Sequence, residues 1–223
     1  MIKNCIVFGT IVTENYLPQA ERLIDSISRF MPVKAYVGVL TSSTKIIPPS
    51  DKYEVLKIPT PFERDDHNRW AAKPWIILRM LNKHDVVFLF DSDLYFVRSP
   101  EQLLEEMKDC DILLTPHYRP VRNDLTWRDG FYNAGFVGAK NTAEGIKGIK
   151  WWEEMCLWKM VKGSNYWDDQ KYLDYMHVVT DRVKPLRHIG YNVGPWKLLE
   201  HQIDSDNHMI KGADDNEYEI ICY

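Results

Sequence analysis

The sequence predicts an α/β fold in a single domain. Short apolar runs rich in β-forming residues alternate with segments of helical periodicity along most of the chain. The opening order is strand, helix, strand, which favours a parallel pair joined by a right-handed crossover. With 223 residues, 45% of them hydrophobic, the chain can bury a full core. We therefore expect a central mixed, mostly parallel sheet flanked by helices.

The first half of the chain alternates regularly between the two kinds of element. Its expected elements are a strand at 5–12, a helix from Leu17 to Met31, strands at 35–41 and 53–58, a helix from Trp70 to Leu81, and a strand at 85–90. Pro18 is tolerated because it falls in the first turn of its helix, and Pro32 ends that helix. About 1–110 is expected to form a nucleotide-binding half.

The second half, 111–223, is expected to hold the sugar and the acceptor. A helix that begins at Ser99-Pro100 leads into this half, whose own expected elements are a strand at 111–116, an irregular surface loop at 117–131, a strand at 136–139, helices from Ile146 to Met160 and from Trp167 to His177, and strands at 183–187 and 217–223. A serine followed by proline is a common way to begin a helix. The chain ends inside a strand-like run, so we expect that it can be one module of a longer protein.

Composition excludes several classes of function. The 28 basic and 32 acidic residues give a net charge of −4, without the concentrated Lys and Arg that nucleic acid or an anionic membrane would need. The four cysteines are widely spread and form no CxxC pair, which argues against zinc or a disulfide framework and for a reducing compartment. No apolar run reaches membrane-spanning length, and no signal peptide is recognisable. We expect a cytoplasmic protein without a transmembrane segment.

The motif with the most chemistry is Asp91-Ser92-Asp93, directly after the strand at 85–90. Ligands bind beyond the carboxyl ends of strands in open α/β sheets, and carboxylates at i and i+2 of an extended segment face the same side. Two such charges are costly without a cation, so the motif indicates a site for Mn²⁺ or Mg²⁺. The alternatives are a polar strand end or the HAD phosphatase motif. The phosphatase needs Thr or Val two residues after the second Asp, where this chain has Tyr95.

Five segments resemble, in order, those of the GT-A nucleotide-sugar glycosyltransferases with a DxD motif, particularly the glycogenin-like and lipopolysaccharide galactosyltransferase-like group. They are TIVTENYLPQAERLIDSISRF, AAKPWIILRMLNKHDVVFLFDSDLYFVRSPEQL, FYNAGFVGAKN, WDDQKYLDY and HIGYNVGPW. The resemblance covers nearly the whole chain. It implies the GT-A fold, a nucleotide-sugar donor with UDP as the expected nucleotide, and Mn²⁺ or Mg²⁺ as the cofactor.

The resemblance also implies roles for particular residues. The expected metal ligands are Asp91, Asp93 and His188. The expected catalytic residues are Asp168, Asp169 and Gln170. The expected donor-binding residues are Thr10, Asn15, Tyr16, Arg69, Lys73, Ser92, Asn133, Gly190 and Lys197. Gly194 stands where the family has a lysine that helps to hold the diphosphate, and either Lys197 or Lys73 can take its place.

Several of these residues also have structural interpretations. His188 can be an ordinary core histidine, and Arg69 can belong to a solvated helix face. Asn15 and the Asp168-Asp169 pair suit helix N-termini, and Asn133 suits a turn. Trp127 and Asp129, in the expected loop, are candidates to meet the acceptor.

The expected reaction is metal-dependent transfer of a hexosyl or deoxyhexosyl group to a hydroxyl of a glycan or glycoconjugate. Retention of configuration is favoured over inversion because the resembled group retains. Two alternatives stay open: a nucleotidyltransferase that makes nucleotide sugars, and a non-catalytic sugar- or nucleotide-binding module. The opening FGTIVTENY lacks the Gly-rich, basic phosphate loop that usually begins a nucleotidyltransferase.

Overall fold

The computed structural model describes residues 5–40, 50–58, 68–119, 125–162, 168–197 and 201–223, with the side chains of 68–71, 159–162 and 168 left out. Its main feature is a seven-stranded sheet in the order β3-β2-β1-β4-β6-β5-β7. The strands are β1 (Ile6–Thr13), β2 (Val33–Leu40), β3 (Tyr53–Lys57), β4 (Val86–Phe90), β5 (Ile112–Pro116), β6 (Tyr132–Lys140) and β7 (Val183–Pro185).

This sheet is mixed and mostly parallel, as the sequence predicts. The pairs β1–β2, β2–β3, β1–β4 and β5–β7 are parallel, whereas β6 runs antiparallel to both of its neighbours, β4 and β5. Phe90, the last residue of β4, pairs with Phe136 of β6. Because β6 runs in the opposite direction, its first residues lie at the edge of the sheet where β4 ends. That reversal brings Asn133 beside Asp91.

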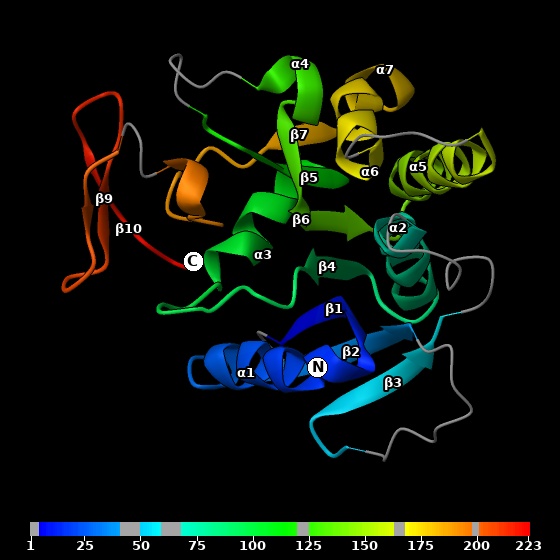
Figure 1. Ribbon diagram of the computed structural model, residues 1–223, viewed down its shortest axis with the longest axis horizontal. Helices are drawn as coiled ribbons and strands as arrows, with labels where there is room; N and C mark the ends of the chain where they lie inside the picture. Colours follow the sequence, from blue (N-terminus) through cyan, green and yellow to red (C-terminus); the bar gives the residue numbers. More distant parts are fainter. Residues whose placement is uncertain (1–4, 41–49, 59–67, 120–124, 163–167, 198–200) are drawn as a thin grey trace.

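Helices cover both faces of the sheet (Figure 1). They are α1 (Leu17–Ser28), α2 (Asn68–Leu81), α3 (Gln102–Glu106), α4 (Thr126–Asp129), α5 (Ala143–Lys162), α6 (Asp168–Lys171) and α7 (Met176–Val179). Short 3₁₀ turns η1 (Glu14–Tyr16), η2 (Met107–Asp109), η4 (Tyr172–Tyr175) and η5 (Pro195–Lys197) accompany them.

The core has one apolar layer on each face. On one side, Leu23 and Ile27 of α1 and Leu103 of α3 pack in one cluster with Phe8 and Phe88 of the sheet. Proline at the second position of α1 fits, since its missing N–H has no partner in a first turn. The face of α1 that carries the predicted apolar residues is therefore the face that meets the sheet.

On the other side, α2 and α5 form a second cluster with the sheet. Ile76 and Met80 of α2 and Trp152 of α5 are fully buried there. The Trp152 indole N–H also donates to the Asp169 carbonyl over 2.6 Å, which ties α6 to α5. This bond helps to fix α6 beside the sheet.

A second, three-stranded antiparallel sheet lies to one side of the first (Figure 1). It consists of β8 (Ile203–Asp204), β9 (Met209–Lys211) and β10 (Glu217–Glu219), in the order β10-β9-β8. The chain then returns to the main body, where Tyr95 and Tyr223 exchange two backbone hydrogen bonds of 3.1 Å. Tyr223 is thereby placed at the edge of the sheet beyond Asp93.

Most expected elements are confirmed, with corrections in the second half. The strand expected at 136–139 spans 132–140, and the helix expected from Trp167 to His177 is divided into α6, η4 and α7. The segment 117–131 is not wholly irregular, because it includes α4, and it is not wholly a surface loop, because His117 and Asp129 are buried. The strand expected at 217–223 ends at Glu219, and β8 and β9 were not predicted. Within the described ranges, no helix combines the length and apolarity needed to cross a bilayer.

Candidate active site

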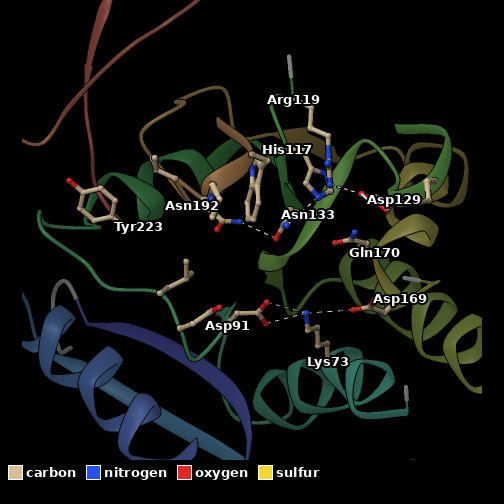
Figure 2. A pocket seen from close by; sticks show the side chains of 17 residues that line it. Lys73, Asp91, His117, Arg119, Asp129, Asn133, Asp169, Gln170, Asn192 and Tyr223 are labelled. Atoms are coloured by element: carbon tan, nitrogen blue, oxygen red, sulfur yellow. Dashed lines mark hydrogen bonds and ion pairs between the residues drawn. The ribbon is translucent and has the colours of Figure 1, made fainter. Parts of the chain in front are cut away.

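Lys73, on α2, lies between two carboxylates at the edge of the sheet where β4 ends (Figure 2). Its Nζ is 3.1 Å from Oδ1 of Asp91 and 3.5 Å from Oδ2 of Asp169. Lys73 and Asp169 are buried, whereas the side chain of Asp91 is 41% exposed. Three elements distant in sequence therefore contribute one ion-pair cluster.

Burial and the neighbouring charges together explain the pKa shifts in this cluster. Burial alone would lower the pKa of Lys73, but Asp91 and Asp169 more than offset this, and the pKa is raised. Burial raises the pKa of Asp169, and Lys73 counteracts it only in part. For Asp93, desolvation and then the neighbouring charge of Asp91 raise the pKa. The ammonium of Lys73 is thus the positive charge that compensates the carboxylates of Asp91 and Asp169.

Gly135 permits the close approach of Asp91 and Asn133. A Cβ at this position would lie 2.6 Å from Oδ1 of Asn133 and 2.9 Å from Oδ2 of Asp91. Without that atom, the Asp91 N–H donates to the Gly135 carbonyl over 2.8 Å. There is therefore a steric reason for glycine as the third residue of the Asn-Ala-Gly sequence, which lies next to the DxD motif.

Asn133 joins a hydrogen-bonded network that extends away from Lys73. Its Oδ1 accepts from the Gly135 N–H over 2.6 Å and from Nδ2 of Asn192 over 3.0 Å. Its Nδ2 donates to Nε2 of His117 over 3.2 Å, while Nδ1 of His117 donates to the Phe131 carbonyl over 3.2 Å. Burial lowers the pKa of His117 to about 4, so the ring is neutral at pH 7.

Two cavities meet at the DxD motif. The larger, of about 580 Å³, is lined by the cluster, by His117, Asn133 and Asn192, and by residues of α4, α6 and the segment 192–196. The smaller, of about 250 Å³, lies against the end of β1 and η1. Lys73, Asp91 and Asp93 line both. A ligand that spans the two cavities would have its middle at these three side chains.

The smaller cavity contains part of the predicted donor-binding set. Tyr16, which is 49% exposed, and Ser92 both line it. Asn15 is exposed on η1 and is not among the residues that line either cavity. Thr10 lines neither cavity, because its side chain is fully buried on the face of β1 that carries Phe8 and Val12, and its role in donor binding stays a prediction. Thr13, three residues on, lines the cavity instead.

Of the three predicted catalytic residues, the structure describes the side chains of two. Asp169 and Gln170 line the larger cavity from α6. The side chains of Asp168 and Arg69 lie outside the described part of the structure. Trp127 is 70% exposed on α4, and Asp129, on the same helix, lines the larger cavity.

His188 lies apart from the DxD carboxylates. Its ring packs edge-on against Tyr191 and Tyr218, with centroid distances of 5.4 and 5.7 Å, and Nδ1 accepts from the Gly190 N–H over 3.2 Å. Burial lowers its pKa. In the described ranges, no three His, Cys, Asp or Glu side chains converge as a metal site. The structure does not bring His188 to Asp91 and Asp93, and its role as a ligand stays a prediction.

Lys197 is turned into the interior in this structure, and its role in donor binding stays a prediction. Its side chain is fully buried, and Nζ donates to the carbonyls of Ile189 and Tyr191, each over 2.8 Å. It lines neither cavity. Lys197 instead ties together the chain that precedes Asn192, and of the two substitutes considered only Lys73 lies at the DxD motif.

The burial of Lys197 predicts a pH dependence of stability. Burial lowers its pKa from 10.5 to about 7, so the unfolded chain binds this proton more tightly and stability rises with pH across that window. Above pH 9.0 the raised thiol pKa values of Cys110 and Cys222 act in the opposite direction. We expect the free energy of unfolding in urea to rise by about 1.4 kcal/mol per pH unit between pH 7 and 9. Lys197→Met should flatten this slope, and an equally steep slope in the variant would contradict the assignment.

Gly190 has a structural role that explains its residue type. A Cβ at this position would lie 1.9 Å from the Glu219 carbonyl oxygen, and the Gly190 carbonyl accepts from the N–H of Ile221 over 2.8 Å. Gly190→Ala should destabilise the protein by about 2–3 kcal/mol, because backbone has to move. Gly38→Ala is the control, since its Cβ would meet only side-chain ends of Ile58 and Ile76, at 3.0 and 3.1 Å. Equal urea midpoints for the two variants would disprove the clash.

Sequence reasoning missed several residues that line the larger cavity. These are His117, Arg119, Arg128, Asn192, Trp196 and Tyr223. The polar and aromatic character of 117–131 was a signal for the first three. The left-handed backbone of Asn192, with φ of 50°, could not be foreseen from its sequence.

Asp91 and Asp93 fit a divalent cation on their chemistry. Both are carboxylates on the border of the two cavities, and Asp93 has a raised pKa caused partly by Asp91. A hard cation that binds one or two carboxylates and completes its shell with phosphate oxygens and water suits this arrangement. The two carboxylates are therefore compatible with a divalent cation, and its binding here stays a prediction.

Comparison with protein-family models gave no match. Two proteins of Bacillus subtilis (strain 168) are similar in sequence. The uncharacterized protein YfnF is 32% identical over 144 residues, 59% of this chain and 48% of YfnF. The uncharacterized protein YfnD is 28% identical over 142 residues, 60% of this chain and 46% of YfnD. The matched stretch thus spans about half the length of each relative.

Among solved structures, the crystal structure of the glycosyltransferase GlyE from Streptococcus pneumoniae TIGR4 superposes with a TM-score of 0.56. The sequences are 16% identical, and the match covers 85% of this chain and 47% of that chain. With the seven-stranded mixed sheet and its flanking helices, this likeness shows that the chain has a glycosyltransferase GT-A-like fold.

Proposed function

We propose that the protein is a glycosyltransferase that moves a hexosyl or deoxyhexosyl group from a nucleoside-diphosphate donor, with UDP as the nucleotide, to a hydroxyl of a glycan or glycoconjugate. The observation that carries this proposal is that the two cavities meet at Lys73, Asp91 and Asp93. A nucleotide sugar has the same order of parts: an aromatic base at one end, a charged diphosphate in the middle and a sugar at the other end.

The smaller cavity suits the nucleoside. Tyr16 offers a half-exposed ring to a base, and the hydroxyl-bearing Thr13 and Ser92 line the same wall. The larger cavity suits the sugar, because the amides of Asn133, Asn192 and Gln170 line it. Amide groups bind neutral hydroxyls without the desolvation cost of an added charge.

The middle of the site must hold a leaving group of high negative charge. Asp91 and Asp93 would hold Mn²⁺ or Mg²⁺, which would supply Lewis-acid stabilisation of the diphosphate when bound. Lys73 contributes a positive charge that is already fixed by Asp91 and Asp169. Such a preorganised charge stabilises the departing diphosphate without reorganisation during the reaction.

The carboxylates favour retention over inversion. An inverting enzyme needs a carboxylate that is free to take the proton of the acceptor hydroxyl. Among the described acids that line the larger cavity, Asp169 is paired with Lys73, and Asp129 is paired with two arginines. The remaining two, Asp91 and Asp93, are assigned to the metal.

A panel of nucleotide sugars tests this proposal. With Mn²⁺ present, we expect at least one UDP-sugar to release UDP slowly to water, and excess chelator to stop the release. Release of pyrophosphate from a nucleoside triphosphate and a sugar phosphate would instead support a nucleotidyltransferase. A protein that releases neither under any metal condition would not fit the proposed transfer.

A further inference from the structure

The larger cavity is electrically divided. At the end next to β4, one lysine faces three carboxylates, those of Asp91, Asp93 and Asp169. At the other end, Arg119 and Arg128 share one carboxylate, that of Asp129. Figure 2 shows Arg119 and Asp129 across the cavity from Lys73 and Asp91, with Asn133 between them. Counting only these described side chains, the first end carries a formal charge of −2 and the second a formal charge of +1.

Asp129 is saturated by its two arginines. Its Oδ2 accepts from Nη2 of Arg119 over 2.6 Å and from Nη2 of Arg128 over 3.0 Å, and its Oδ1 accepts from Nε of Arg128 over 2.6 Å. The side chain of Asp129 is 3% exposed, and the arginines hold the pKa of its carboxyl below the ordinary value despite burial. Both oxygens are thus used, and one positive charge remains at this end.

Part of that remaining charge is buried and lacks an acceptor. The side chain of Arg119 is only 12% exposed, and in the described structure its Nε has no hydrogen-bond partner. Neighbouring His117 cannot serve, since its Nδ1 donates to Phe131 and its Nε2 already accepts from Asn133. A buried donor without an acceptor is costly, and more so when it belongs to a charged group.

The chemistry that would satisfy this end is an oxyanion. A guanidinium presents its N–H groups in a planar fork that matches the oxygens of a carboxylate or a phosphate. Arg128 also lines this end of the cavity, and its side chain is 39% exposed, so that an anion can reach it.

We propose that the Arg119–Arg128 end of the larger cavity is the acceptor subsite, and that it binds the carboxylate or phosphate of an acidic saccharide. This inference rests on the proposed function, which places the donor at the opposite end. It narrows the acceptor from glycans in general to acidic ones. The opposite charges at the two ends also keep an anionic acceptor away from the carboxylates that would hold the metal.

The test follows the side-chain Nε–Hε signals of ¹⁵N-arginine in the nucleotide-free protein by NMR. Sodium D-glucuronate, D-glucose 6-phosphate and D-glucose are added separately at constant ionic strength, and signals are assigned with Arg119→Gln and Arg128→Gln. We expect the signals of Arg119 and Arg128 to shift with at least one anion and not with glucose. A response to glucuronate alone identifies a carboxylate acceptor, and a response to the phosphate alone identifies a phosphorylated one.

Arg187 provides the matched control, because it is exposed and lines neither cavity. Its signal should stay in place, and in Arg128→Gln the dissociation constant of the anion, followed at Arg119, should rise at least about tenfold. No shift with either anion, an equal shift with glucose, or an equal shift at Arg187 would overturn the proposal. The NMR titration contains no nucleotide, so its result does not depend on donor binding. A failure of the donor assays would refute the proposed transfer without changing whether an anion binds at Arg119 and Arg128.

Discussion

Asp93→Asn should reduce metal-dependent hydrolysis of the UDP-sugar donor at least about a hundredfold, the scale on which removal of one charge-stabilising group acts on a transition state. The amide keeps the size of the side chain but removes one of the two negative charges that would hold the cation. Asp93 is exposed and lines both cavities. The fold should therefore be unaffected, and the loss should appear in UDP release at saturating donor.

Asp51→Asn is the matched control for this experiment. Asp51 is exposed just before β3 and lines neither cavity, so the same chemical change there should leave hydrolysis within about twofold of the wild type. Raising the Mn²⁺ concentration should recover part of the activity of Asp93→Asn, because weakened metal binding is the cause. Unchanged hydrolysis by Asp93→Asn would remove this residue from the metal site.

Lys73→Met should lower the free energy of unfolding by about 3–5 kcal/mol, the cost of leaving one member of a buried ion pair without its partner. Asp169 is buried, and Lys73 is the positive charge beside it. Asp91 loses the same partner but can turn to solvent, since its side chain is 41% exposed. Urea unfolding at pH 7 measures the change.

The double variant Lys73→Met/Asp169→Asn separates ion pairing from packing. It should recover a large part of the lost stability, because the amide that replaces the buried carboxylate has no charge to bury. Lys52→Met is the control, since its ion pair with Asp25 is half exposed on both sides and its loss should leave the urea midpoint nearly unchanged. If the double variant is no more stable than Lys73→Met, the loss is one of packing and the electrostatic account is wrong.

The main sheet could be predicted because its strands and helices follow simple periodicities. The apolar run of β4 and the helical spacing of α1 and α2 each specify an element without tertiary information. The second sheet could not be predicted in the same way. Its strands β8 and β9 have two and three residues, too few for a pattern, and they depend on contacts such as those of buried Ile210.

The candidate site was predictable where one short motif supplies the geometry. Asp91 and Asp93 follow a buried strand, and the Asn-Ala-Gly start of β6 lies beside them because β6 runs antiparallel to β4. The direction of the Lys197 side chain could not be predicted, because its distance in sequence from Gly194 carries no information about it. Its Nζ turns to two carbonyls in the interior.

The arginine end of the larger cavity shows a different limit of sequence reasoning. Arg119, Arg128 and Asp129 lie within eleven positions, which is typical of a solvated loop. Only the turn of α4 brings both guanidinium groups onto one buried carboxylate. Ion pairs that depend on tertiary contacts produce no periodic pattern in the sequence, so they cannot be predicted from it.

Isothermal titration calorimetry of UDP binding, with and without Mn²⁺, tests the central claim most directly. The claim is that Asp91 and Asp93 form a metal–diphosphate site where the two cavities meet. We predict that UDP binds with one-to-one stoichiometry in Mn²⁺, that chelation weakens binding at least about tenfold, and that uridine, which lacks the diphosphate, gains nothing from the metal. Binding of UDP that is equally tight with and without Mn²⁺, or no binding of UDP in either condition, would contradict the claim.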